Sequence, residues 1–389
     1  MDRIYMDHIA GTPLLPGVLD AMLPFLKEKY GNASSIHNFG EEAEIAINGA
    51  RENVAALIGA DSDEIFFTSC GTESNNFALK GVTLARLSKG NHIITTPIEH
   101  FSIMHTIKAM EKTGFDVSLI PVDGYGMVDP DDVSRAITDK TVLVSIQHAN
   151  SEVGTVQPIA EIGRICRERG IPFHTDAVAS AGTVPIKVKD MNLDLLSMSA
   201  NMFYGPQGAA ALYVRKGVPI RPLLDGGIQE RGIRAGTENV PAIVGMGVAA
   251  EAAATDMKKR REHLLELNKM LRHGLCERIE HFHEFGHPEL RLPGNVSLGA
   301  EFVEGESVLL FMDMEGIALA SGSACISRSL KVSHVMLAMG IDHATAQGSL
   351  LFSLGKDNTK TDVEKVWAVL PPIIQRLREM SPLYMKKSI

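Results

Sequence analysis

The chain has 389 residues, of which 45% are hydrophobic and 22% are charged, and its net charge at pH 7 is −9. This length predicts a large buried core divided into two domains, and the acidic balance argues against nucleic acid as a partner. The sequence has neither an N-terminal signal pattern nor a long uncharged apolar run, so we expect a cytoplasmic protein without a membrane segment.

The cysteines are few and far apart. The four are Cys70, Cys166, Cys276 and Cys325. None forms a C-x-x-C pair, so the spacing predicts neither a self-contained zinc site nor a disulfide framework.

The N-terminal part begins with a short strand, which ends in the turn Gly11-Thr12-Pro13. Residues 41–58 carry apolar side chains at helical spacing, which predicts an amphipathic helix. Short β-rich apolar runs follow at 65–67, 93–94, 117–120, 142–146 and 172–174, separated by helical patterns. This alternation predicts an α/β fold with a mostly parallel, doubly wound sheet, whose ligands bind beyond the carboxyl ends of the strands.

Polar residues follow several of these runs. Gly71 and Thr72 come after 65–67, at the start of a helix, and this pattern indicates a phosphate cradle; a plain threonine N-cap is the alternative. His100 follows the next run, and a lone histidine there is by itself more often a core or surface residue. Asp176 leaves the run 172–174 towards the sheet edge, where an unpaired carboxylate is costly to bury.

The character of the sequence changes near residue 255. A charged helical pattern runs over 257–280, and mixed short strands and helices follow. We therefore predict a large domain over 15–255 and a small α+β domain made of 1–14 with 256–389. The small domain contains Cys325 in the loop Ser321-Gly322-Ser323-Ala324-Cys325, where small neighbours leave a thiol accessible as a nucleophile or metal ligand.

Several segments together resemble the cysteine desulfurases of the NifS/IscS type, which are class V aminotransferases of fold-type I and use pyridoxal 5'-phosphate (PLP). The resembling segments are Tyr5 to Pro13, Tyr30 to His37, Thr68 to Asn76, His148 to Gly154, His174 to Ser180, Leu195 to Gly208, Gly226 to Val240, Ser321 to Cys325, Ser349 to Lys356 and Met380 to Tyr384. The resemblance covers essentially the whole chain. It implies the fold of a PLP-transferase, with a large cofactor-binding domain and a small domain that carries the cysteine loop.

The resemblance also assigns roles to residues. The cofactor-binding positions are Gly71, Thr72, His100, Ser151, Asp176, Ser199, Asn201 and Thr237. Asp176 would pair with the pyridinium nitrogen, His100 would stack on the ring, and Thr237 would reach the phosphate of the other subunit's cofactor, which implies a homodimer. His100 and Cys325 are the predicted catalytic residues.

Five positions depart from the family pattern. Asn201 and Met202 replace the His-Lys pair whose lysine forms the Schiff base with PLP, and methionine cannot form an imine or carry a proton. Ser151 and Ala179 replace two contacts to the phenolic oxygen. Leu351 replaces the arginine that clamps the substrate carboxylate. We interpret this as natural divergence, similar to an archaeal-type branch of IscS-like proteins that lacks the lysine.

The leading hypothesis is a cysteine desulfurase-like protein of iron–sulfur cluster assembly whose ordinary turnover of L-cysteine is lost or weak. Cys325 would pass sulfur to an IscU-type scaffold, taking it from L-cysteine or another donor, or would ligate an iron–sulfur cluster shared with that partner. A second hypothesis is an active desulfurase that uses non-covalently bound PLP. A third is a structural or regulatory partner that binds no cofactor.

Overall fold

The computed structural model describes residues 3–322, 332–381 and 384. Its strands are β1 Ile4–Tyr5, β2 Ile65–Thr68, β3 His92–Thr95, β4 Asp116–Leu119, β5 Thr141–Ser145, β6 Phe173–Asp176, β7 Leu195–Ser199, β8 Ala210–Val214, β9 Phe282–Glu284, β10 Asn295–Ala300, β11 Ile317–Ala318 and β12 Ser349–Ser353. The α-helices are α1 Pro16–Lys27, α2 Asn38–Ile58, α3 Gly71–Ala85, α4 Phe101–Glu111, α5 Pro130–Ala136, α6 Ile159–Arg169, α7 Val240–Cys276, α8 Gly305–Met314, α9 His334–Ala338, α10 His343–Gln347 and α11 Lys360–Glu379.

The main sheet has seven strands in the order β2-β8-β7-β6-β5-β3-β4. The five strands from β7 to β4 are parallel, whereas β8 is antiparallel to both of its neighbours. The predicted α/β fold is confirmed, and the predicted strands occur within one or two residues of the expected positions. Because the parallel strands point the same way, the residues that follow β3, β5, β6 and β7 gather at one edge of the sheet.

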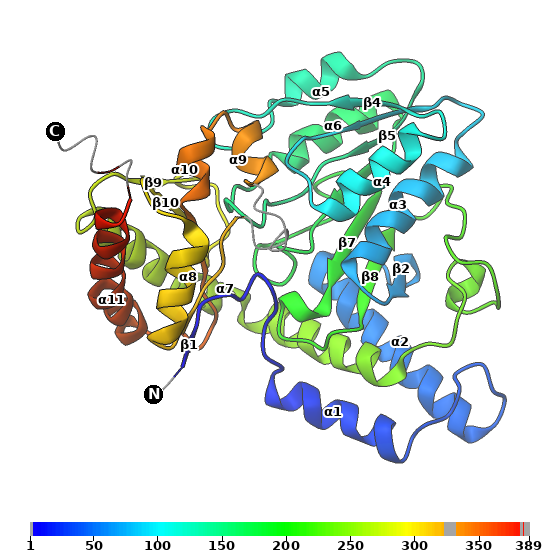
Figure 1. Ribbon diagram of the computed structural model, residues 1–389. Helices are drawn as coiled ribbons and strands as arrows, with labels where there is room; N and C mark the ends of the chain where they lie inside the picture. Colours follow the sequence, from blue (N-terminus) through cyan, green and yellow to red (C-terminus); the bar gives the residue numbers. More distant parts are fainter. Residues whose placement is uncertain (1–2, 323–331, 382–383, 385–389) are drawn as a thin grey trace.

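Both faces of this sheet are buried, as a doubly wound sheet requires. Alternate strand residues face opposite sides: Phe66 packs with α3 and α4, while Ile65 and Phe67 pack with α2 and α7. Figure 1 shows α3 and α4 in front of the strands. The amphipathic helix predicted at 41–58 is α2, which begins slightly earlier, at Asn38.

A second core lies around a three-stranded antiparallel sheet of order β12-β10-β9 and a parallel pair of β1 with β11. It contains Ile4 and Met6 from the N-terminal segment together with apolar residues of α8, α11 and the second half of α7. Figure 1 shows β1, α8 and α11 grouped beside the main sheet. The N-terminal segment is thus packed with elements more than 300 positions away in sequence.

Helix α7 joins the two cores. Its residues up to Ala253 pack in the first core, and those from Leu264 onward pack in the second. The sequence pattern indicated only its charged second half, since the first half lacks alternating charges; the Asn239 side chain accepts from the Ala242 N–H at 3.3 Å and caps its start. The domain boundary predicted at residue 255 falls inside this helix, and that division stays a prediction.

Length and composition alone would also let α7 cross a membrane, and half of its most apolar window is buried in the protein. A buried core helix has the same composition, so this is weak evidence for a membrane segment.

Candidate active site

A cavity of about 320 Å³ lies at the carboxyl edge of the main sheet, where the second core meets it. Seven of the predicted cofactor-binding residues line it: Gly71, Thr72, His100, Ser151, Asp176, Ser199 and Asn201. Met202, Ala179 and Leu351, which depart from the family pattern, line the same cavity. Thr237 is exposed and does not line it, and Cys325 lies outside the described residues.

One end of the cavity is the start of α3. The N-cap residue Cys70 makes no side-chain capping bond, so the free N–H groups of the first turn and the positive end of the helix dipole are available to an anion. A Cβ atom at Gly71 would lie 2.6 Å from Val178 Cγ2, so glycine allows this close approach. The Ser199 hydroxyl, which donates to Asn201 Oδ1 at 2.6 Å, lines the same cavity.

Asp176 ends β6 inside the cavity and is held by two donors. The Val178 N–H donates to Oδ1 at 2.9 Å, and the Asn75 side-chain amide donates to Oδ2 at 2.6 Å. Burial raises the pKa of Asp176, and the nearby His100 acts in the opposite direction. A cationic ring nitrogen would relieve this burial penalty.

His100 caps α4 and is fixed by Ser102. Its Nδ1 accepts from the Ser102 N–H at 3.1 Å and is 2.7 Å from the Ser102 hydroxyl. The same hydroxyl accepts from the Asn75 amide at 2.8 Å. His100, Ser102, Asn75 and Asp176 therefore form one connected network along the wall of the cavity.

Two further carboxylates line the cavity. Glu152 follows Ser151 and is hydrogen-bonded to the Ser333 hydroxyl, and burial raises the pKa of Glu152 to about 7. Asp7 comes from the N-terminal segment; its Oδ1 is buried without a hydrogen-bond partner, and burial raises its pKa to about 6. Together with Asp176, these groups give the cavity three acidic side chains.

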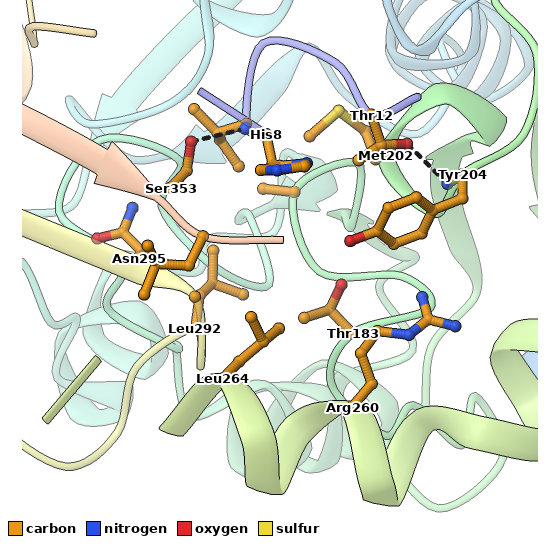
Figure 2. A pocket seen from close by; sticks show the side chains of 14 residues that line it. His8, Thr12, Thr183, Met202, Tyr204, Arg260, Leu264, Leu292, Asn295 and Ser353 are labelled. Carbon is orange, nitrogen blue, oxygen red and sulfur yellow. Dashed lines mark hydrogen bonds between the residues drawn. The ribbon is translucent and has the colours of Figure 1, made fainter. Parts of the chain in front are cut away.

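Met202 lines both this cavity and a smaller one of about 50 Å³, as do Ile9 and Ala179. Figure 2 shows the smaller cavity, with His8, Tyr204 and Arg260 around it. The Arg260 guanidinium lies 5.0 Å from the Tyr204 ring centre. Lys356 lines neither cavity; its ammonium pairs with Asp357 at 2.7 Å and lies 5.6 Å from the Tyr204 ring centre. Among the described residues, no lysine lines either cavity.

The loop that carries Thr237 is anchored by ion pairs. Arg51 donates to both carboxylate oxygens of Glu230 at 2.7 and 2.8 Å, and both side chains are buried. Arg234 donates to Glu73 of the first turn of α3 at 2.8 Å. The loop is thus tied to the phosphate end of the cavity through Glu73.

The residues present fit PLP. An uncapped helix start and the Ser199 hydroxyl suit its phosphate, and the buried Asp176 carboxylate, held by the Asn75 amide and the Val178 N–H, suits its ring nitrogen. The retained residues would supply binding and orientation, but the side chain at position 202 cannot attach the cofactor covalently.

Sequence reasoning missed Asn75, Asp7 and Glu152 as cavity residues. Asn75 lies three positions after Thr72 on the same helix, so its helical spacing was the available signal. Asp7 and Glu152 stood in segments that resembled the family, but nothing local indicated that both would face one cavity.

The chain is similar in sequence and fold to several known proteins. Residues 4–366 match the aminotransferase class-V family. A protein named cysteine desulfurase IscS from Methanosarcina thermophila is 51% identical over 384 residues, which cover 99% of this chain and 95% of that relative. A cysteine desulfurase IscS from Clostridium botulinum strain Hall is also 51% identical, over 98% of this chain and 97% of the relative.

A solved structure described as a NifS-like protein superimposes with a TM-score of 0.91 at 38% identity, covering 96% of this chain and 100% of that one. The fold predicted from sequence, that of the fold-type I PLP enzymes, agrees with this match. The chain belongs to the class-V aminotransferase family, in the group of IscS- and NifS-like cysteine desulfurases.

Proposed function

We propose that this protein is a cysteine desulfurase-like component of iron–sulfur cluster assembly, in which Cys325 passes sulfur to an IscU-type scaffold and the ordinary turnover of L-cysteine is lost or weak. The observation that carries this proposal is the position of Met202. It lines the same cavity as Gly71, Asp176 and Ser199, so the groups that would hold PLP are kept while the group that would attach it is absent.

The predicted cofactor-binding residues that line the cavity each have a proposed task when PLP is bound. The start of α3, Ser199 and Asn201 would bind the phosphate, and His100 would pack on the ring. Asp176, oriented by Asn75, would keep the ring nitrogen protonated, and Ser151 would donate to the phenolic oxygen. PLP would supply an electron-accepting ring.

Proton transfer is the task that lacks an obvious residue. In the family the lysine both holds the cofactor and moves a proton, and among the described residues that line the cavity none is a lysine. Glu152, whose pKa is raised to about 7 by burial, is a carboxyl group in this cavity that could exchange a proton near neutral pH. Turnover would therefore be several orders of magnitude slower than in a lysine-containing relative.

We further propose a homodimer in which Thr237 reaches the partner's cofactor phosphate. The exposed position of Thr237 and the anchoring of its loop by Arg51 and Arg234 support this arrangement. Within each chain, residues 15–255 would form the cofactor-binding domain, and 1–14 with 256–389 the domain that carries Cys325. In an assembly with the scaffold, Cys325 would hold sulfur or share an iron–sulfur cluster with that partner.

A second candidate function is an active desulfurase with non-covalently bound PLP, and the connected network of His100, Ser102, Asn75 and Asp176 favours it. A cofactor-free structural role is disfavoured by Asp176. Without a cationic ring, that buried carboxylate would cost about 1–3 kcal/mol or take up a proton.

The test uses the purified protein, an IscU-type scaffold, ferrous iron, a thiol reductant and a small-molecule persulfide as sulfur donor. The donor gives its outer sulfur to the Cys325 thiolate and leaves as a thiol, so this step needs no oxidant. We expect Cys325→Ser to abolish cluster formation on the scaffold, followed by absorbance, while the two proteins still elute together from a sizing column. Cys276→Ser is the matched control, because Cys276 is an exposed free cysteine at the end of α7 and lies far along the chain from the site. Unimpaired cluster formation by Cys325→Ser would refute the proposed role.

A further inference from the structure

The cavity has an unusual charge for a site that would accept an amino acid. Among the described residues that line it, three are carboxylates, Asp7, Glu152 and Asp176, and none is a lysine or arginine. One of the three, Asp176, would be occupied by the ring nitrogen of PLP. Asp7 and Glu152 remain to face any second ligand.

The position of Leu351 is fixed rather than adjustable. It lies in strand β12, where its N–H donates to the Ala320 carbonyl at 2.8 Å and its carbonyl accepts from the Ala320 N–H at 3.0 Å. On the other side, β12 pairs in register with β10, which places Leu351 opposite Ser297. Leu351 is 4% exposed and lines the cavity. An apolar side chain is therefore held where a carboxylate clamp would be needed.

Three further apolar side chains line the cavity, those of Met202, Ile9 and Val178. A carboxylate placed against Leu351 would lose its water there and, unlike one placed against an arginine, would gain no charged partner, and this loss is costly for an ion. The phosphate of PLP would already occupy the free N–H groups at the start of α3.

Asp7 and Glu152 favour the opposite charge. The Asp7 Oδ1 atom is buried without a partner, and Glu152 abuts the chain at Gly322, where an added Cβ would lie 3.1 Å from Glu152 Oε2. Burial raises the pKa of both groups, to about 6 and about 7. A ligand ammonium group would offset this penalty, because an opposite charge nearby stabilises the ionised carboxylates.

We propose that the donor end of this cavity selects a small primary amine that lacks an α-carboxylate, such as the aminothiol cysteamine, over the corresponding α-amino acid. This inference rests on the proposed function for the identity of the cavity as the cofactor and sulfur-donor site, and it names the class of donor. Leu351 and Met202 exclude the carboxylate, while Asp7 and Glu152 attract the ammonium group.

The test is calorimetric titration of the full-length protein, with and without added PLP, using pairs of ligands that differ only in the carboxylate. The pairs are cysteamine with L-cysteine and ethanolamine with L-serine; the second pair avoids the reaction of aminothiols with PLP in solution. We expect each amine to bind about tenfold or more tightly than its amino acid. Equal or tighter binding of the amino acids would overturn the inference.

Variants make the test specific to the residues that carry it. Leu351→Arg is expected to reverse the preference, because a guanidinium pairs with a carboxylate and repels an ammonium group. Leu351→Gln is the matched control: it is polar and of similar size but uncharged, and the preference for the amine should persist. If Leu351→Arg fails to fold, Glu152→Gln still tests the inference, since loss of this charge should shrink the preference.

An unchanged preference in both Leu351→Arg and Glu152→Gln would overturn the inference. These outcomes are separate from those of the scaffold assay. Cluster formation from a small-molecule persulfide through Cys325 involves no amine, so the proposed function can stand while the inferred ligand class fails. The reverse outcome is also possible to distinguish. If the protein prefers amines but Cys325→Ser still supports cluster assembly, only the sulfur-transfer role of Cys325 is refuted.

Discussion

The side-chain amide of Asn75 donates to the carboxylate of Asp176 at 2.6 Å, although the two residues are 101 positions apart. Both side chains are buried and both line the cavity. The amide orients the carboxylate towards the space that the ring of PLP would occupy. This single contact joins α3, which would hold the phosphate, to β6, which would hold the ring nitrogen.

The first prediction concerns that carboxylate. Asp176→Asn removes the negative charge that pairs with the ring nitrogen but keeps the size of the side chain. We expect the affinity for PLP to fall about tenfold or more, or by about 1.4 kcal/mol, since a charge-assisted hydrogen bond is lost. Absorbance during equilibrium dialysis measures this. Asp190→Asn, the same change at an exposed position, should leave the affinity unchanged, and equal affinities of the two variants would contradict the assigned role of Asp176.

The second prediction concerns Met202. In the native protein, borohydride treatment in the presence of PLP should leave no cofactor attached after denaturation, because no lysine among the described residues lines the cavity. Met202→Lys should become labelled, which mass spectrometry of the digested chain would locate at position 202. Lys356→Ala is the control, since the Lys356 ammonium pairs with Asp357 and Lys356 does not line the cavity. Labelling of the native chain that Lys356→Ala abolishes would show that Lys356 serves as the missing lysine.

The third prediction concerns stability. Arg51 and Glu230 form a buried, two-bond ion pair, and Glu230 also accepts from the Phe67 N–H at 2.8 Å. Arg51→Met leaves a buried carboxylate unpaired and should lower the free energy of unfolding by about 3–5 kcal/mol. Arg164→Met breaks an exposed pair with Glu168 and should cost about 1 kcal/mol or less.

Urea unfolding followed by circular dichroism compares these variants. The double variant Arg51→Met with Glu230→Gln should be less destabilised than the sum of the single changes, because the unpaired charge is gone. Similar decreases in the free energy of unfolding for Arg51→Met and Arg164→Met would show that the buried ion pair contributes no more to stability than the exposed one.

The fourth prediction concerns the dependence of stability on pH. Glu99 is fully buried behind the cavity, and this burial raises its pKa from 4.5 to about 8. Between these two values the folded protein keeps a proton that the unfolded chain has lost, so this group stabilises the fold below about pH 4.5 and the contribution is lost as the pH rises through about 8. Glu99→Gln has no such proton to lose.

We therefore expect Glu99→Gln to gain stability over the native protein as the pH increases from about 5 to about 8.5. The Oε1 atom of a glutamine can still accept from the Gln147 N–H and the Thr96 hydroxyl, which Glu99 accepts at 3.0 and 2.8 Å. Thermal unfolding across this range measures the difference. Parallel stability curves for the two proteins would mean that Glu99 does not titrate in the folded state.

Several features followed from the sequence alone. The short apolar runs determined the strands, since period and length are local properties, and the residues that follow them, Gly71, Asp176 and Ser199 among them, do lie at one cavity. The replacement of the expected lysine by Met202 could also be read directly. Each of these depends on residues that are neighbours along the chain.

Tertiary structure decided the rest. The full length of α7, the pairing of Asn75 with Asp176 and the contact of Glu152 with Ser333 join segments that no local pattern connects. The acidic character of the cavity is also of this kind: Asp7, Glu152 and Leu351 come from three distant segments, and the charge that a ligand meets is the sum over all the side chains around it. That sum exists only after the chain has folded, because only then do the burial and the distances that determine each charge's effect become fixed.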